Sequence, residues 1–205
     1  MALVYNHEEI TPRELKPALY ELDGISRETI KAHYKLYEGY VNKRNEILEK
    51  LAGIDLSGAN QVYSEVRALK VDLSFAIGGI KNHEIYFEHL GGHGGEPSGI
   101  FGDLVRRDFG STGEWKADLK ATGMAGRGWA WTAYDWDEGR LFNYIGDAQN
   151  TFPVWNATAL VALDVYEHAY FIDFGTDRSG YIDAFFDNLD YDVVNDWAQQ
   201  YQIRP

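Results

Sequence analysis

Three of the chain's six histidines stand where regular secondary structure would bury them. His33 and His83 fall on apolar stripes of helical period, and His168 follows Asp164 by four residues at the end of an apolar run. A buried imidazole needs a partner for each ring nitrogen, and one metal ion can satisfy several imidazoles at once. Three imidazoles and a carboxylate suit manganese, iron or zinc better than magnesium or calcium. For each histidine taken alone, a hydrogen-bonded core residue is the alternative interpretation.

The composition excludes cysteine-based chemistry and disfavours several classes of partner. The chain has no cysteine, so thiolate zinc sites, iron–sulfur clusters, disulfides and cysteine nucleophiles are excluded. The formal net charge of −13 disfavours nucleic acid as a partner, because phosphate binding depends on clustered positive charge. No stretch approaches the ~18 consecutive apolar residues of a membrane span, and the first residues lack a signal-peptide pattern. We therefore expect no membrane partner and a cytoplasmic location.

The elements that would position the histidines fall into two halves. LGGHGGEPSG, residues 90–99, places five glycines and one proline in ten positions, which is typical of a link between domains. We expect a helical hairpin domain over residues 1–90 and an α+β domain over 91–205. Apolar positions of helical period predict long helices over about 27–52 and 62–87, the second interrupted or kinked at Gly78-Gly79.

In the second half the period changes, and the pattern favours α+β with a small antiparallel sheet. Residues 128–134 and 140–146 flank a turn and predict a β-hairpin, and the apolar run 160–165 predicts a central strand. Short helices are predicted over residues 100–108, 114–124, 167–174, 179–189 and 192–201.

Four segments resemble the iron and manganese superoxide dismutases, and they occur in that family's order. DVYEHAY, residues 164–170, resembles the family signature DVWEHAYY, and GRGWAW, residues 126–131, resembles its GSGWAW. KNHEIYF, residues 81–87, resembles the segment NHxxFW, and TIKAHYKLYEGYV, residues 29–41, resembles the first metal helix. The family's fold, a helical hairpin followed by an α+β domain, is also the one that periodicity predicts.

The resemblance implies a metal-dependent enzyme. His33, His83, Asp164 and His168 would hold one manganese or iron ion per subunit, whose redox cycling converts superoxide to O₂ and hydrogen peroxide. The resemblance also implies a homodimer or tetramer, in which Glu167 and Tyr170 lie at the two-fold interface and Glu167 reaches the partner's ligand histidine.

Two further residues match the family's catalytic positions. Gln149 would tune the metal-bound solvent, and its place after the β-hairpin is typical of manganese-type members, whereas iron-type members carry this glutamine on the second helix. This gives a slight preference for manganese. Tyr40 would be the gateway tyrosine that passes protons. It follows His33 by seven residues rather than the usual eight, and seven steps of about 100° keep it on the same face of a regular helix, without a π-bulge.

Other matched residues would surround the metal. Phe87, Trp129, Trp131 and Tyr166 would form an apolar wall, with plain core packing as an equally good interpretation. Tyr37 replaces the family's gateway histidine and Phe171 replaces its usual cross-subunit tyrosine, so we expect an altered proton relay. Basic residues near the mouth would attract the anionic substrate, and the candidates are Lys35, Arg127 and Arg178. The remaining histidines, His7, His89 and His93, are expected in loops or solvent.

Two other functions stay open. A catalytically impaired superoxide dismutase-like protein that keeps its metal as a binding or structural protein is favoured weakly by Tyr37 and Phe171. A carbohydrate-binding or glycosidase surface would use the aromatic, acidic second half, although no carboxylate pair stands out by spacing.

Overall fold

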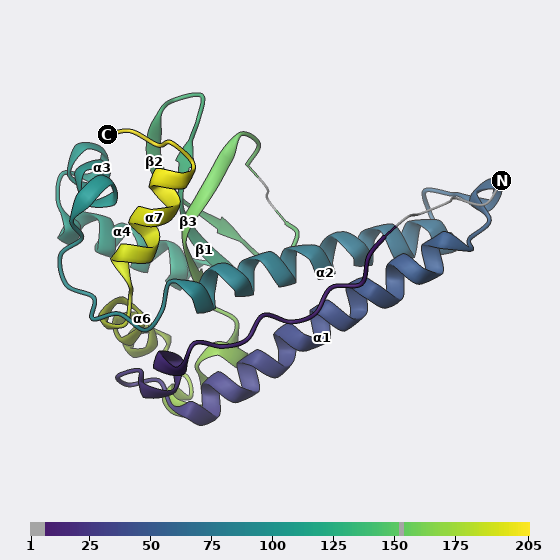
Figure 1. Ribbon diagram of the computed structural model, residues 1–205, viewed down its shortest axis with the longest axis horizontal. Helices are drawn as coiled ribbons and strands as arrows, with labels where there is room; N and C mark the ends of the chain where they lie inside the picture. Colours follow the sequence, from purple (N-terminus) through teal and green to yellow (C-terminus); the bar gives the residue numbers. More distant parts are fainter. Residues whose placement is uncertain (1–6, 152–153) are drawn as a thin grey trace.

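Two long helices form an arm that projects from an α+β body (Figure 1). The computed structural model describes residues 7–151 and 154–205. Helix α1 spans Arg27–Ala52 and α2 spans Glu65–Glu88. Each begins after a serine, Ser26 or Ser64, whose hydroxyl accepts a hydrogen bond from a backbone N–H of the first turn. The predicted hairpin is confirmed, although α2 begins at Glu65 rather than at residue 62.

The predicted break in α2 at Gly78-Gly79 is wrong, because the helix runs through both glycines without interruption. Instead, the two glycines allow other segments of the chain to pack closely against α2. A Cβ atom at Gly78 would lie 2.0 Å from the carbonyl oxygen of Gln149, and one at Gly79 would lie 2.7 Å from the ring of Tyr40. Glycine is therefore required here for packing between segments rather than for bending the helix.

The sheet has three antiparallel strands in the order β2-β1-β3. Strand β1 spans Trp129–Asp135, β2 spans Arg140–Gly146 and β3 spans Ala157–Asp164. The β-hairpin and the small antiparallel sheet are confirmed. The run expected to form the central strand forms β3, which is an edge strand. It is nevertheless buried at its end, since α2 and the last helix pack against it.

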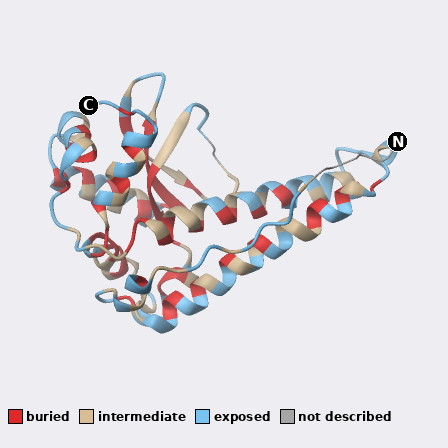
Figure 2. Cartoon of the chain, in the orientation of Figure 1, coloured by how far each residue is buried: buried red, intermediate tan, exposed pale blue. Residues whose placement is uncertain are grey.

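Short helices cover the rest of the body (Figure 1). They are α3 Gly99–Phe109, α4 Thr112–Ala125, α5 Phe171–Phe174, α6 Arg178–Asp187 and α7 Tyr191–Gln200. The helix predicted over 167–174 is instead a 3₁₀ turn, Glu167–Ala169, followed by the single turn α5. Buried residues gather where the base of the arm meets the sheet (Figure 2), which is where β3 ends. None of the helices in the described residues is long and apolar enough to cross a membrane.

His89 was expected in a loop or in solvent, and this expectation is wrong. Its side chain is fully buried at the C-terminal end of α2, and its Nε2 accepts a hydrogen bond of 2.9 Å from the backbone N–H of Ala162 on β3. Burial, with Lys16 nearby, lowers the pKa of His89 to about 3. His89 is therefore neutral in the folded protein at every pH near neutrality. His93, by contrast, is exposed, as expected.

His89 should make the fold sensitive to acid. Between its ordinary pKa of 6.5 and about 3, the unfolded chain binds a proton that the folded chain does not, so stability falls as pH falls through this window. At pH 5 the expected loss is about 2 kcal/mol relative to pH 7. His89→Gln keeps an acceptor but does not titrate. Urea unfolding of the metal-free wild type and of metal-free His89→Gln, each at pH 7 and pH 5, measures the difference. The wild type should lose about 2 kcal/mol more free energy of unfolding than the variant. Equal losses in the two proteins would contradict the assignment to His89.

Candidate metal centre

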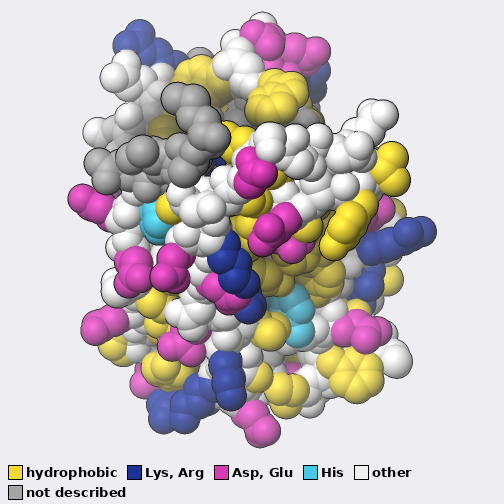
Figure 3. Space-filling view, turned by 90° about the vertical axis from the view of Figure 1, so that its right-hand side faces the viewer, with side chains coloured by type: hydrophobic (Ala, Val, Ile, Leu, Met, Phe, Trp, Pro, Cys, Tyr) yellow, Lys and Arg dark blue, Asp and Glu magenta, His cyan; other side chains and the backbone are white. Residues whose placement is uncertain are grey.

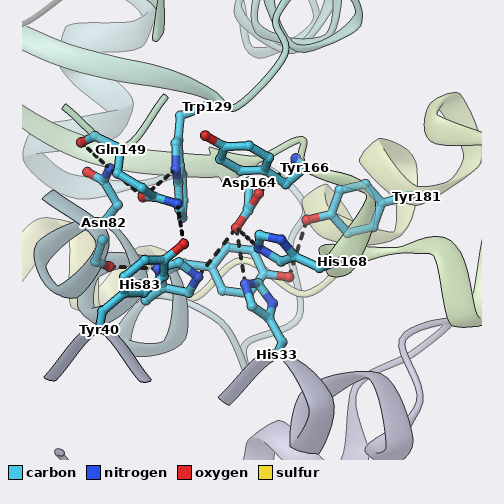
Figure 4. Close-up of polar contacts among 12 residues, drawn as sticks. His33, Tyr40, Asn82, His83, Trp129, Gln149, Asp164, Tyr166, His168 and Tyr181 are labelled. Carbon is cyan, nitrogen blue, oxygen red and sulfur yellow. Dashed lines mark hydrogen bonds and ion pairs between the residues drawn. The ribbon is translucent and has the colours of Figure 1, made fainter. Parts of the chain in front are cut away.

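Four side chains from four elements converge where the arm meets the sheet (Figure 4). His33 comes from α1, His83 from α2, Asp164 from the end of β3 and His168 from the 3₁₀ turn. One nitrogen or carboxylate oxygen of each lies within 4.8 Å of all the others. His33, His83 and Asp164 are buried, and the side chain of His168 is 25% exposed. The structure thus brings together all four residues expected to bind metal.

The donor atoms face a common point. Asp164 Oδ2 lies 3.0 Å from His33 Nε2, 3.1 Å from His168 Nε2 and 3.7 Å from His83 Nε2. The backbone N–H of Tyr166 donates to the other oxygen, Oδ1, at 2.9 Å and orients the carboxylate. Three imidazole nitrogens around one carboxylate form a mixed nitrogen and oxygen donor set, which suits manganese, iron or zinc.

His83 gives the clearest sign that a metal fits. Its Nδ1 lies 2.6 Å from the carbonyl oxygen of Gly79, one turn earlier in α2, so Nδ1 is the nitrogen that carries the proton. The opposite nitrogen, Nε2, is buried, faces Asp164 and has no hydrogen-bond partner among the described residues. A metal-bound histidine commonly donates its other ring N–H to a carbonyl in this way. The residues present therefore fit a metal ion.

The electrostatics of the cluster favour the metal-binding forms of His33, His83 and Asp164, whereas His168 keeps its proton to higher pH until a metal displaces it. Burial lowers the pKa of His33 below its ordinary value despite the opposing effect of Asp164, and burial lowers the pKa of His83 to about 3. Burial alone would raise the pKa of Asp164, but His168 and His33 outweigh it, so this pKa is lowered. Burial also opposes the charged form of His168, yet Asp164 leaves its pKa raised. Neutral imidazoles and an ionised carboxylate are the forms that bind metal.

Gln149 reaches the cluster from the segment after β2. It is 4% exposed, and its Oε1 accepts hydrogen bonds from Trp129 Nε1 at 3.0 Å and Asn82 Nδ2 at 3.3 Å. Its Nε2 donates to the hydroxyl of Tyr40 at 3.3 Å. These contacts fix which end of the amide carries the donor and aim it at the hydroxyl (Figure 4). Asn82 was not predicted from the sequence, and its only signal there is its place directly before His83.

Tyr40 lies beside the metal cluster. The prediction of a regular first helix is confirmed, because α1 is α-helical throughout and the ring of Tyr40 lies 5.4 Å from the ring of His83. Burial raises the pKa of Tyr40, so the hydroxyl keeps its proton at neutral pH.

The expected aromatic side chains surround the histidines at different distances. The ring of Phe87 lies 5.1 Å from His33, that of Trp129 lies 5.2 Å from His83, and Tyr166 stacks on His168 at 5.1 Å. Trp131 is one layer further out, because it stacks on Trp129 at 6.1 Å. On the face toward the tip of the arm, hydrophobic and histidine side chains are exposed in a hollow with both acidic and basic residues around it (Figure 3).

Tyr37 was expected beside the metal, but its hydroxyl bonds with Glu84 and with the N-terminal segment instead. Its hydroxyl donates to Glu84 Oε1 at 2.9 Å and accepts from the backbone N–H of Arg13 at 2.9 Å. The guanidinium of Arg13 also lies 3.2 Å from Glu84 Oε2. Arg13 belongs to an extended segment, residues 7–16, that follows the arm toward its base (Figure 1). Tyr37 therefore anchors this segment, a function that the sequence pattern gave no reason to expect.

Removing this anchor should loosen the N-terminal segment. Tyr37→Phe leaves Glu84 Oε1 without its hydroxyl donor and the N–H of Arg13 without an acceptor, so the free energy of unfolding should fall by about 2 kcal/mol. Trypsin should then cleave after Arg13 more rapidly. The matched control is Tyr34→Phe, because the hydroxyl of Tyr34 donates to the carbonyl of Arg13 at 3.0 Å in an exposed position that water can replace. If urea unfolding showed the same loss of free energy of unfolding for the two variants, Tyr37 would not be the anchor of the N-terminal segment.

Three other expected site residues are placed as follows. Glu167 is exposed beside His168. The ring of Tyr170 is buried against Tyr181, and its hydroxyl accepts from Arg178 Nε at 3.2 Å. Arg178 also donates to backbone carbonyl oxygens at the end of α4, including that of Gly126 at 2.7 Å. These bonds fix the guanidinium in place without removing its charge, so its part in attracting substrate stays a prediction.

Comparison with known proteins agrees with this geometry. Residues 14–91 match the alpha-hairpin domain of the iron/manganese superoxide dismutases, and residues 97–197 match their C-terminal domain. The chain belongs to the iron/manganese superoxide dismutase family. Within this family it is 44% identical to superoxide dismutase [Fe] of Aquifex aeolicus over 194 residues, which cover 92% of this chain and 90% of that protein.

Family relatives named for either metal are similar to this chain. Superoxide dismutase [Mn] 1 of Halobacterium salinarum is 35% identical, over 91% of this chain and 95% of that protein. Superoxide dismutase [Fe] of Cupriavidus metallidurans is 36% identical, over 88% of this chain and 91% of that protein. The names therefore support an iron or manganese ion and do not choose between the two metals.

Proposed function

We propose that this protein converts superoxide to O₂ and hydrogen peroxide with one manganese or iron ion held by His33, His83, Asp164 and His168. The observation that carries this proposal is the buried, unpartnered Nε2 of His83, which faces the other three donors. When bound, the ion supplies one-electron oxidation and reduction, by which two superoxide ions and two protons give one O₂ and one hydrogen peroxide. The family membership of the chain supports the same activity.

The protein's own part is to hold the donors and to supply protons. Asp164 contributes the one negative charge among the four donors, and its orientation is fixed by the N–H of Tyr166. Tyr40 keeps its proton at neutral pH, and its hydroxyl oxygen accepts from Gln149, which leaves its own O–H free to donate toward a reduced substrate. Trp129 and Phe87 keep water away from the buried side of the cluster.

We further propose a slight preference for manganese. The support is the position of Gln149, which comes from the segment after β2, as in manganese-type members of the family. A side chain at Gly78 or Gly79 would clash with Gln149 or Tyr40, so α2 has no room for a glutamine of the iron type at these positions.

We also propose that the protein is a homodimer or tetramer. Exposed apolar side chains lie on neighbouring elements close to His168: Leu36 on α1 is 41% exposed, and Phe171 and Ile172 on α5 are 52% and 49% exposed. A second subunit that covered them would bring the exposed Glu167 near the partner's site. The part that Tyr170 would play is to shape this surface through its contact with Tyr181.

The test is to strip the purified protein of metal, reload it separately with manganese and with iron, and measure superoxide decay directly. We expect about one ion per subunit and metal-dependent activity, higher with manganese. Equal or higher activity with iron would overturn the preference alone. Metal bound without activity would favour the alternative, a catalytically impaired metal-binding protein, and would direct attention to Tyr37.

A further inference from the structure

His89 links two elements that carry metal-binding residues. It caps the C-terminal end of α2, the helix of His83, and its imidazole accepts a hydrogen bond from Ala162 on β3, the strand that ends at Asp164. Both His89 and Ala162 are fully buried, so water cannot replace this bond. Because Nε2 accepts, the proton lies on Nδ1, which is buried and has no hydrogen-bond partner among the described residues, so the Nε2 bond alone selects this tautomer.

The hydrogen bond from Ala162 to His89 lies at the outer edge of the sheet. Among the described residues, strand β3 pairs only with β1, so its outer edge has backbone groups without a strand partner there. The N–H of Ala162 faces this outer edge, and His89 is its acceptor. Ala162 and Asp164 are two residues apart and lie on the same face of β3. A shift of the strand edge at Ala162 would therefore move the carboxylate.

The surroundings of His89 hold its ring in one place. The rings of Tyr86, Phe185 and Trp197 pack around it at centroid distances of 6.5, 5.7 and 6.1 Å. The backbone carbonyl of His89 also accepts a hydrogen bond of 2.8 Å from the N–H of Asp190, just before α7. The backbone hydrogen bond and the neighbouring rings thus fix the imidazole in place. Its hydrogen bond with Ala162 then fixes the position of β3 as well.

We propose that His89 is a positioning residue for the metal centre: it holds β3 in register with α2 and so sets Asp164 relative to His83. This inference rests on the proposed metal-binding function. The positioning role predicts that the site binds its metal ion less tightly when the hydrogen-bond acceptor of residue 89 is removed, and not when only the side-chain volume changes. Outer partners of metal ligands typically change metal affinity by about 10–100-fold, and His89 acts through two intervening residues, so we expect the lower end of this range.

The experiment compares His89→Leu, which fills a similar space without an acceptor, with His89→Gln, which keeps an acceptor. All proteins are loaded with Mn²⁺ and then mixed with excess EDTA, and the loss of bound manganese is followed by electron paramagnetic resonance. We expect His89→Leu to release manganese about tenfold faster than the wild type, with a changed spectrum of the bound ion. His89→Gln should stay within about twofold of the wild type in rate and keep its spectrum.

Two results would overturn the positioning role. One is release at the wild-type rate from His89→Leu, and the other is equally fast release from both variants, which would mean that the ring's shape matters and its acceptor does not. A wild-type protein that takes up no manganese or iron would instead overturn the proposed function as a whole. If His89→Leu does not fold, His89→Met replaces it, because the flexible methionine side chain fills irregular space. Amide exchange of Ala162 in the wild type adds a check: fast exchange would contradict the bond.

Discussion

Asp164→Asn is expected to weaken binding of manganese or iron by more than ~100-fold and to abolish superoxide dismutation. This is beyond the loss that outer partners of a metal site usually cause, because the change removes a donor and its charge directly. Asp164 is the one anionic donor of the cluster, and its Oδ2 lies within 3.7 Å of a nitrogen from each of the three histidines. Elemental analysis of the purified variant, together with its superoxide decay rate, measures both effects.

The control for this variant is Asp183→Asn, the same chemical change at an aspartate whose side chain is 61% exposed and pairs with Lys120 on the surface. Exposed ion pairs contribute little, so metal content and activity should match the wild type. An Asp164→Asn protein that still carried a full complement of metal would contradict the assignment of this carboxylate.

Gly78→Ala is expected to destabilise the protein by about 1–3 kcal/mol, although alanine is the better helix former. The added Cβ would lie 2.0 Å from the carbonyl oxygen of Gln149, so either α2 or the segment after β2 must move. That segment carries the side chain that contacts Tyr40, so activity should fall together with stability. Urea unfolding and superoxide decay measure the two effects.

A glycine on the other helix supplies the comparison. Gly39 is exposed within α1, and a Cβ there meets nothing within 4 Å. Gly39→Ala should therefore stabilise the protein by about 1 kcal/mol. If the two alanine variants had the same effect on unfolding, the close approach of Gln149 to α2 would not matter for stability.

The sequence predicted those parts of the fold that depend on local pattern. The hairpin of α1 and α2 and the strands β1 and β2 follow from apolar periodicity and turn residues. The metal cluster followed from histidines on apolar faces together with the resemblance of segments such as residues 164–170. The spacing of these residues could not show that the four side chains meet at one point, because their meeting depends on how the arm packs on the sheet.

What the sequence did not predict depends on contacts between distant segments. Gly78 and Gly79 have the composition of a helix break, but close packing of Gln149 and Tyr40 uses them within an unbroken helix. The strand ending at Asp164 is apolar because helices cover it and not because it is central. His89 carries no local sign of burial, since its acceptor role depends on a strand more than seventy residues away.

Tyr37 shows the limit of transferring a role by position. The resemblance of residues 29–41 to the family's first metal helix predicted that it takes the place of the gateway histidine, yet its hydroxyl bonds with Glu84 and Arg13. Arg13 lies just before residues 14–91, the part that matches the family's hairpin domain. A residue at a matched position can therefore acquire a different partner from a segment outside the match.

We propose that three histidines and one aspartate hold a redox-active metal ion in this protein. X-ray absorption at the manganese or iron edge of the loaded protein tests it most directly, because imidazole rings give a distinct outer-shell scattering pattern. We expect nitrogen and oxygen atoms around the metal with scattering from three imidazoles, which falls to two in a His83→Ala protein that still binds metal. A shell of oxygen atoms without imidazole scattering would contradict it.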